Sequence, residues 1–433
     1  MSELKRHMGL FQLTMYGVGL TLGAGIYVLI GEASGFAGNS MWISFGLGAI
    51  VAMFAGLSYS ELAVLFPKAA AEYIFVKNAF RSEFIGFLVG WLTVITSMIV
   101  GATVALGFGG YFAQFFDVPI AVSAILLLAV LSVVNFIGIK QSAWMNTVFA
   151  LVTIAGLGII IFLGFTFEVS EPIDYLDSPN GITGIMLAFV LIFFAFIGFE
   201  DMANVAEEVK RPKKTLPRAI ILSVLITVTI YILVSLSSVR ILNWEELSQS
   251  SAPLADIATR GLGLGGGITM SIIALFATAS TVLITIVAGA RILYGMAKAN
   301  SLPNILGKVH SKTGTPWIAI IGIFVTSVVF AFVGDIVIVA NITVFAIVIT
   351  FAAVNLAVIV LRYTEPDIER KFKVPVNIGK FPILPLFGFA ITLYMAIQFE
   401  LEIIFAGLGI IGTGVVFYFL YNKRKVNPSD SPV

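Results

Sequence analysis

The sequence predicts an all-α, multi-pass membrane protein with about 12 transmembrane helices. Three observations support this fold class. Of the 433 residues, 59% are hydrophobic and 11% are charged, the mean hydropathy is +1.04, and the apolar residues form long runs separated by charged residues, glycines or prolines. A chain this apolar could not hide its surface in one water-soluble core. Because a spanning helix needs about 20 apolar residues, the length leaves room for about a dozen spans.

The apolar runs define segments that follow one another along the chain. They are expected at residues 11–35, 40–66, 84–115, 119–138, 143–167, 182–207, 217–240, 267–297, 316–333, 336–362, 381–399 and 401–422. No linker divides them, so residues 1–433 are predicted to form one membrane domain with a disordered tail at 425–433. The stretch 241–266 has room for a short helix that begins at Pro253 and acts as a lid.

The basic residues predict the orientation of the chain in the membrane. If the N-terminus is cytoplasmic, 23 of the 25 basic residues lie in cytoplasmic segments, and only Arg240 and Arg260 lie outside. Basic residues concentrate on the cytoplasmic side of membrane proteins. We therefore expect a protein of the plasma membrane with both termini in the cytoplasm.

Composition and charge argue against several classes of function. The net charge of +1 argues against a nucleic acid partner, because such binding needs a concentrated basic surface. The chain has no cysteine and only two histidines, His7 and His310, both in charged segments, so we expect no cofactor and no metal centre built on these residues. An enzyme would need a catalytic set of titratable groups, and a channel filter normally repeats over subunits or uses rings of charge. A carrier is therefore favoured over an enzyme, a sensor or an ion channel.

The first segment has the composition of a helix that is interrupted inside the membrane. It contains five glycines, with Gly23-Ala24-Gly25 near its middle. Glycine accepts non-helical backbone angles at little cost, and unwound backbone at this depth is tolerated only where protein buries it or it lines a cavity. The alternative is that these glycines only allow helices to pack closely.

The sixth segment has two carboxylates where a continuous span would be apolar. The run 193–199 is followed directly by Glu200 and Asp201, and an ionisable residue inside a membrane marks a functional position by default. A break near Ile197-Gly198 would put both carboxylates in the first turn of a second half-helix, where the helix dipole favours them. Simple capping by Glu200 is the alternative role.

Two interruptions placed five segments apart predict a particular architecture. They are expected of a transporter that is built from two inverted five-helix repeats, with its binding site where the repeats meet. The first repeat would cover 11–167 and the second 182–362, and 381–422 would form two peripheral helices. The sequences of the two halves show no visible similarity, so the repeat is inferred from the interruptions.

Several motifs occur in a definite order along the chain. They are Gly17-Val-Gly-Leu-Thr-Leu-Gly-Ala-Gly-Ile-Tyr27, Gly90-Trp91, Gly109-Gly110-Tyr111, Phe196-Ile-Gly-Phe-Glu200, Glu207-Glu-Val-Lys-Arg-Pro-Lys-Lys-Thr-Leu-Pro-Arg218, Arg291-Ile-Leu-Tyr-Gly-Met-Ala-Lys298, Leu302-Pro303 and Thr313-Gly-Thr-Pro316. Together they resemble the amino acid-polyamine-organocation transporters, especially the cationic amino acid transporter-like and the archaeal or bacterial amino acid permease branches. The resemblance covers nearly the whole chain. It implies the five-plus-five inverted-repeat fold and secondary active transport of an amino acid across the lipid bilayer by alternating access.

The resemblance also implies a substrate site at the two helix breaks. The substrate carboxylate would lie on amide groups at the first break, because N–H groups at a half-helix N-terminus bind an anion without a basic side chain. The matching amides are those of Gly23, Ala24, Gly25 and Ile26. The substrate ammonium group would be held by carbonyl oxygens, and the matching residues are Thr21, Phe194 and Ile197.

The positions that match the side-chain pocket of such transporters are nearly all apolar. They are Val94, Met98, Gly101, Phe194 and Ile197. A cationic side chain would need a carboxylate or several acceptors there, and Glu200 is the only obvious candidate. This pattern favours a neutral amino acid over a cationic one. Ordinary helix packing is the alternative for each of these residues.

The resemblance leaves the coupling ion open. Many relatives carry a lysine where this chain has Thr153, so coupling through that lysine is excluded here. The residues that match the sodium site of related folds are Gly19, Leu22, Ala277, Ser280 and Thr281. Neutral oxygens of this kind suit Na⁺, although hydroxyls in membrane helices often bond only their own helix. A proton on Glu200, whose pKa burial would raise, and exchange without an ion are the other possibilities.

Overall fold

The computed structural model describes residues 4–113, 115–168, 172–250, 252–331 and 336–426, and their regular structure is almost entirely helical. The helices of the first half are α1 (Leu10–Thr21), α2 (Ala24–Ala37), η1 (Gly38–Ser40), α3 (Met41–Leu65), α4 (Ala71–Phe80), α5 (Glu83–Ala113), α6 (Ile120–Ile137) and α7 (Ile139–Thr166). The second half contains α8 (Gly181–Ile192), η2 (Phe193–Phe196), α9 (Asp201–Asn204), η3 (Ala206–Glu208), α10 (Pro212–Ile241), α11 (Trp244–Ser248), α12 (Pro253–Leu262), α13 (Leu264–Lys298), η4 (Asn304–Gly307), α14 (Trp317–Phe330), α15 (Ile336–Thr364), β1 (Asn377–Ile378), β2 (Phe381–Pro382), α16 (Ile383–Ala396) and α17 (Leu401–Val426).

Each predicted span corresponds to a helix or to a pair of half-helices. Within the described residues, nine stretches are long and apolar enough to cross a membrane, and α14 and α16 are shorter apolar helices. Large apolar side chains point away from the bundle, as on α6, where Leu126, Val130 and Val133 are each more than half exposed. Their spacing of three or four residues makes one continuous helix face. Such a face is stable only against lipid, which confirms the multi-pass membrane fold.

The largest difference in a predicted boundary is at α10, which begins at Pro212 rather than at residue 217. Proline is well suited to the first turn of a helix, where its missing N–H has no intrahelical acceptor. Pro212 therefore begins the helix, and Pro217 lies within it at the cost of one backbone hydrogen bond. The helix thus starts one turn and a half earlier than the apolar run.

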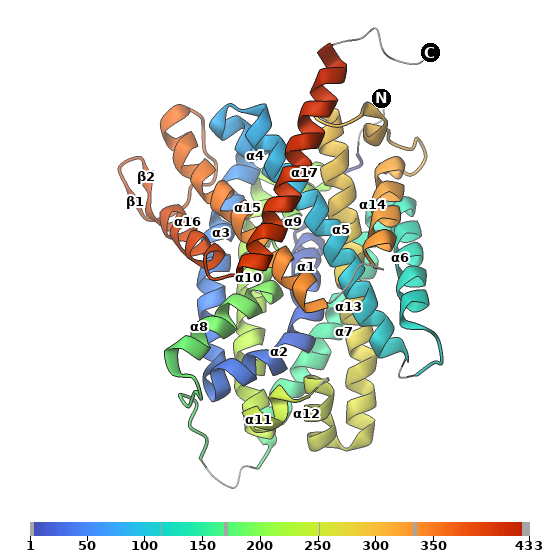
Figure 1. Ribbon diagram of the computed structural model, residues 1–433, viewed down its shortest axis with the longest axis vertical. Helices are drawn as coiled ribbons and strands as arrows, with labels where there is room; N and C mark the ends of the chain where they lie inside the picture. Colours follow the sequence, from blue (N-terminus) through green and yellow to red (C-terminus); the bar gives the residue numbers. More distant parts are fainter. Residues whose placement is uncertain (1–3, 114, 169–171, 251, 332–335, 427–433) are drawn as a thin grey trace.

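The segments that carry most basic residues gather at one end of the bundle. In Figure 1, α4 and the end of α17 lie at the top with the start of the chain, whereas α11 and α12 lie at the opposite end. Arg260 on α12 pairs there with Glu246 on α11 at 2.7 Å. The predicted orientation would place this end in the cytoplasm; that orientation stays a prediction, and "cytoplasmic end" is used below only as a label for the α4 end.

The helix predicted within 241–266 is present, whereas the predicted disordered tail is described only at its first two residues. Residues 241–266 form α11 and α12, and α12 begins at Pro253 as expected. This segment packs on α2, where Ser34 Oγ lies 3.2 Å from the carbonyl oxygen of Trp244. Of the predicted tail, residues 425 and 426 end α17, and the remainder lies outside the described residues.

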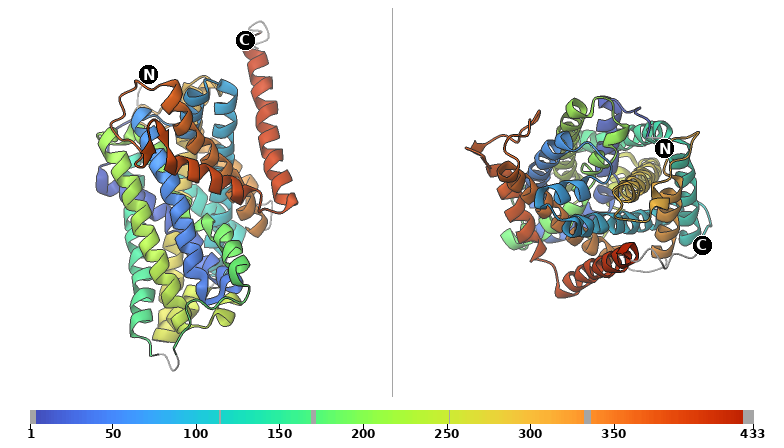
Figure 2. Two further views of the ribbon diagram at one scale, coloured as in Figure 1. Left: turned by 90° about the vertical axis from the view of Figure 1, so that its left-hand side faces the viewer. Right: turned by 90° about the horizontal axis from the view of Figure 1, so that it is seen from above.

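The bundle is organised around α13, which is the most buried of the long spans. Seen from above in Figure 2, this yellow helix lies in the middle of the molecule. By contrast, α17 is largely exposed and stands along the outer side of the bundle. It contacts α5 through stacked rings, with the centroids of Trp91 and Phe417 5.0 Å apart. The predicted division into a first and a second repeat remains a prediction.

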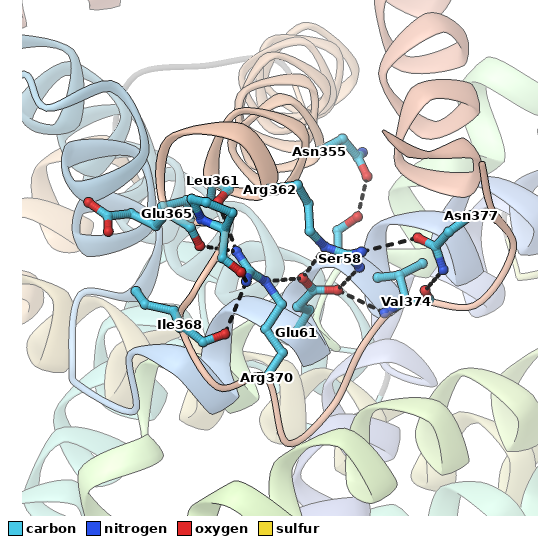
Figure 3. A network of polar contacts seen from close by, with 11 residues as sticks. Ser58, Glu61, Asn355, Leu361, Arg362, Glu365, Ile368, Arg370, Val374 and Asn377 are labelled. Atoms are coloured by element: carbon cyan, nitrogen blue, oxygen red, sulfur yellow. Dashed lines mark hydrogen bonds and ion pairs between the residues drawn. The ribbon is translucent and has the colours of Figure 1, made fainter. Parts of the chain in front are cut away.

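A buried ionic network joins α3, α15 and the loop that follows α15. Figure 3 shows Glu61 of α3 between two arginines, Arg362 and Arg370. Glu61 accepts hydrogen bonds from Arg362 Nε at 2.7 Å and Nη2 at 2.6 Å. Arg370 Nε lies 3.2 Å from Glu61 Oε1. The backbone N–H of Val374 also donates to Glu61, at 2.8 Å. One carboxylate therefore holds two helices and a loop together at the cytoplasmic end.

The network predicts a large stability effect for Glu61→Gln. This change leaves two buried arginines close together without their counter-charge, and breaking a buried ion pair in this way typically costs about 3–5 kcal/mol. The matched control is Glu365→Gln, which removes an exposed pair with Arg81 worth about 1 kcal/mol or less. Thermal unfolding in detergent should show a much lower midpoint for Glu61→Gln than for the control. Equal midpoints would contradict this reading of the network.

Candidate functional site

The first span is interrupted where the glycine cluster predicted. Helix α1 ends at Thr21, Leu22 and Gly23 are non-helical, and α2 begins at Ala24. The first amides of α2 lack intrahelical acceptors, as at any helix N-terminus. The amide of Ala24 lies 3.4 Å from Thr281 Oγ1 of α13. Gly25 packs directly on η2, since a Cβ added at Gly25 would lie 2.7 Å from Ala195 Cα.

The sixth span is interrupted at Ile197-Gly198, as predicted. Ile197 is extended, with φ −66° and ψ 133°, and Gly198 has φ +137°, a conformation that favours glycine. Asp201 lies in the first turn of α9. Glu200 Oε2 accepts a hydrogen bond from the amide of Gly198 at 2.8 Å. Glu200 therefore satisfies a donor released by the break rather than a first-turn amide of α9.

Tyr231 of α10 joins the two interrupted spans. Its hydroxyl is shared between the carbonyl oxygen of Thr21 and that of Ala195, 2.8 Å from the latter. The side chain is fully buried, and its ring packs against Phe45 and Phe196. A carbonyl at a helix end inside a membrane needs a partner, and Tyr231 supplies one to both spans. The sequence pattern did not single out this tyrosine, although it is a polar group within an apolar run.

A cavity lies against both breaks and extends toward the cytoplasmic end. Several residues predicted for substrate or ion binding line it: Thr21, Ala24, Gly25, Phe194, Ile197, Glu200 and Thr281. Gly19, Leu22, Gly23, Ile26, Ala277 and Ser280 are not among its lining residues. The amides at the start of α2 and the carboxylates after the second break thus share one cavity.

The α5 wall of the cavity differs from the predicted one. It is formed by Thr93, Thr96, Ser97 and Val100, whereas Val94, Met98 and Gly101 are absent from the lining. A shift of one residue turns a helix by about 100°, so the predicted and observed residues lie on adjacent faces. Ser327 of α14 packs on the predicted face and lies 3.2 Å from the carbonyl oxygen of Met98. The α5 wall of the cavity is therefore more polar than the predicted residues would make it.

The residues predicted to hold sodium form two groups of contacts. Ser280 Oγ lies 2.9 Å from the carbonyl oxygen of Gly19, and Thr281 Oγ1 lies 3.3 Å from that of Ala277. Asn146 of α7, which the pattern did not select, completes the first group: its Oδ1 lies 2.6 Å from Ser280 Oγ, and its Nδ2 donates to the carbonyl oxygen of Met15 at 2.9 Å. The oxygens suit Na⁺ in type, but they already satisfy one another.

Thr153 does not contribute to that group. Its hydroxyl donates to the carbonyl oxygen of Phe149, four residues earlier on the same helix, at 3.0 Å. A hydroxyl bonded in this way is satisfied by its own helix. The position that matches the family lysine therefore offers no free polar group here. Asn146, two turns earlier on α7, instead contacts Met15 of α1 and Ser280 of α13.

Three buried carboxylates line the cytoplasmic part of the cavity: Glu72, Glu200 and Asp201. Glu72 belongs to α4, a helix that the apolar pattern did not predict because it is short and polar at its start. Within the described chain, no group of three or more His, Cys, Asp or Glu side chains is arranged to hold a metal ion. Carboxyl groups that share a cavity offer acid–base chemistry.

A bundle of membrane spans with two interrupted helices around a common cavity is the architecture of a secondary transporter. Residues 8–421 match the model of the amino acid permease family, and the chain belongs to this family. It is 28% identical to the branched-chain amino acid permease BcaP of Bacillus subtilis strain 168, over 98% of this chain and 94% of the relative. It is also 27% identical to the methylthioribose transporter of the same organism, over 98% and 94%, and 30% identical to human cationic amino acid transporter 4, over 73% of this chain and 53% of the relative.

The packing at the first break predicts that Gly25→Ala removes transport. The new methyl group would meet the backbone of η2 at Ala195, and backbone cannot move aside as a flexible side chain does. Uptake of radiolabelled leucine by proteoliposomes should fall at least tenfold, which corresponds to about 1.4 kcal/mol or more of lost binding. Gly46→Ala is the control, because a Cβ there meets nothing within 4 Å. Leucine uptake that is equal in both variants would contradict a substrate site at this break.

Proposed function

We propose that this protein is a secondary active transporter that carries neutral amino acids into the cell across the plasma membrane, driven by a proton gradient. The observation that carries the proposal is the start of α2, where the first amides lack intrahelical acceptors and Ala24 and Gly25 line a cavity shared with the end of η2. Such amides bind a carboxylate through backbone geometry and the helix dipole. The substrate carboxylate is expected at Ala24 and Gly25, and its ammonium group beside the carbonyl oxygens of Thr21 and Ile197.

The cavity wall supports a neutral substrate. One oxygen of each carboxyl group that a cationic side chain would need already accepts a hydrogen bond: Glu200 from the Gly198 amide, and Asp201 and Glu72 from Asn204. The hydroxyls of α5 can orient a substrate without adding charge. The relative named as a branched-chain amino acid permease supports the same substrate class. Because the carboxylates do line the cavity and another relative is named as a cationic amino acid transporter, a cationic substrate is the second candidate.

A competition experiment tests the substrate class. Purified protein in proteoliposomes would take up radiolabelled leucine under an inward proton gradient, with each of the 20 amino acids and methylthioribose as unlabelled competitors. We expect leucine, isoleucine and valine to abolish uptake of the label, and arginine, lysine and methylthioribose to leave it unchanged. Strong competition by arginine and lysine would favour the second candidate. An ohmic, non-saturating flux would overturn the carrier itself.

The coupling ion is tested by removing sodium. The oxygens near Ser280 bond one another, so we expect replacement of Na⁺ by choline to leave proton-driven leucine uptake unchanged. Ser280→Ala should then show no altered sodium dependence. Loss of uptake in choline, together with a raised KM for sodium in Ser280→Ala, would instead support sodium coupling. Exchange that is never concentrative would exclude both ions.

A further inference from the structure

Glu72 lies at the contact between the cytoplasmic helix α4 and the second half of the interrupted span. Its side chain is fully buried and lines the same cavity as Gly25 and Thr21. Glu72 Oε1 accepts hydrogen bonds from Tyr59 Oη and Asn204 Nδ2, each at 3.2 Å. Glu72 Oε2 is buried and has no hydrogen-bond partner among the described residues. One oxygen of this carboxyl group is thus held, and the other is left for a proton.

Asn204 links Glu72 to α9, the short helix that follows the break at Ile197-Gly198. Its Nδ2 lies 3.4 Å from Asp201 Oδ1 as well as 3.2 Å from Glu72 Oε1. Its Oδ1 accepts a hydrogen bond from the amide of Ala71 at 2.8 Å. One side chain on α9 therefore holds both the start of α4 and two carboxyl groups. A change in the charge of Glu72 acts directly on the contact between α4 and α9.

Five basic side chains of neighbouring elements are paired with other carboxylates. Arg291 of α13 pairs with Glu208 at 3.0 Å, Lys77 of α4 pairs with Glu83 of α5, Arg81 pairs with Glu365 of α15, and Arg362 and Arg370 share Glu61. Around Glu72 itself lie Tyr59 of α3 and the carboxyl groups of Asp201 and Glu200. In the described structure these three buried carboxyl groups have no basic partner, and buried charges without one are strongly disfavoured.

A proton is the counter-charge that this geometry accommodates. Hard cations bind several oxygen ligands at once, whereas Glu72 Oε2 is a single unpartnered oxygen in this part of the cavity. Burial raises the pKa of Glu72 to about 7, against the opposing effect of hydrogen bonds from Asn204 and Tyr59. Below about pH 7 the group is therefore neutral in this conformation, and above it the group carries a charge beside Asp201.

We propose that Glu72 is the residue that carries the coupled proton and releases it to the cytoplasm, which deepens the proton-driven function proposed above and rests on it. On release, the O–H bond at Oε2 breaks, the electron pair stays on the carboxylate, and the proton passes to water. The new charge has no basic partner in the described structure, and a buried charge of this kind requires hydration. Separation of α4 from α9 supplies that water and opens the cavity toward the cytoplasm. Reprotonation restores the closed contact.

The experiment compares Glu72→Gln with wild type in two assays on proteoliposomes with radiolabelled leucine. Glutamine reproduces the neutral, protonated form and cannot release a proton. We expect leucine accumulation under an inward pH gradient to fall to the level without a gradient. Exchange of leucine at equal pH on both sides should persist but lose the pH dependence that wild type shows around pH 7. Glu72→Asp should recover gradient-driven accumulation, because it restores a titratable group.

The matched control is Glu245→Gln on α11, which removes an exposed carboxylate and should behave as wild type in both assays. Gradient-driven accumulation by Glu72→Gln equal to wild type would overturn the assignment. Loss of accumulation in Glu200→Gln alone would move the proton to Glu200. If wild type itself does not respond to the pH gradient, the proton-driven function fails and the assignment fails with it.

If Glu72→Gln does not fold, the proposal is tested on Glu72→Asp instead. The quantity measured is the stabilisation by leucine against thermal unfolding, as a function of pH. Thermal unfolding of the purified protein in detergent would be measured with and without leucine from pH 5 to pH 9. A changed pH midpoint of protection relative to wild type supports the proposal. An unchanged midpoint contradicts it, because a residue that only supports the fold would not move that value.

Discussion

The structure depends on one constraint: backbone groups that a helix break releases inside a membrane must find partners within the protein. Both breaks meet this constraint with side chains, two from other helices and one from the second break itself. Tyr231 binds carbonyl oxygens on both interrupted spans, Thr281 lies near the first amide of α2, and Glu200 accepts the amide of Gly198. The amides that remain at the start of α2 face the cavity. The carboxylate of a zwitterionic ligand is a suitable acceptor for such amides.

The buried charges of the protein fall into two groups with different roles. Glu61 and Glu208 are bound by arginines in close geometry, so they hold helices together and their charge is fixed. Glu72, Glu200 and Asp201 lack basic partners in the described structure and line the cavity. A carboxyl group in the second situation changes its charge far more easily than one in the first. The fold thus separates ionic groups that fasten the bundle from carboxyl groups that have no fixed counter-charge among the described residues.

The sequence was sufficient for the spans, for their order and for both breaks, because these follow from local features. A run of apolar residues, the cluster around Gly23 and the carboxylates after Gly198 are each visible without knowledge of the partners. On α5 the cavity is lined by Ser97 and not by the predicted Met98, because a difference of one residue selects another helix face. Such a difference leaves the predicted span unchanged while it changes the chemistry of the cavity wall.

The parts of the site that escaped prediction are contacts between segments far apart in the sequence. Tyr231 and Asn146 are single polar residues in apolar runs, and only the folded chain shows what they touch. Glu72 lies between the predicted spans 40–66 and 84–115, and its burial follows from the packing of α4 against α5 and α15. No local pattern encodes these contacts, because each of the three residues has a partner more than 100 residues away.

The short parallel bridge between Met8 and Val209 links the entry to α1 with the exit from α9. Amides of His7 and Met8 donate to the carbonyl oxygen of Glu208, and the amide of Lys210 donates back to Met8. The cytoplasmic halves of both interrupted spans are therefore fastened to each other outside the cavity. A spectroscopic label attached near residue 8 would consequently report on the rotation of the sixth span as well as the first, without any alteration within the cavity.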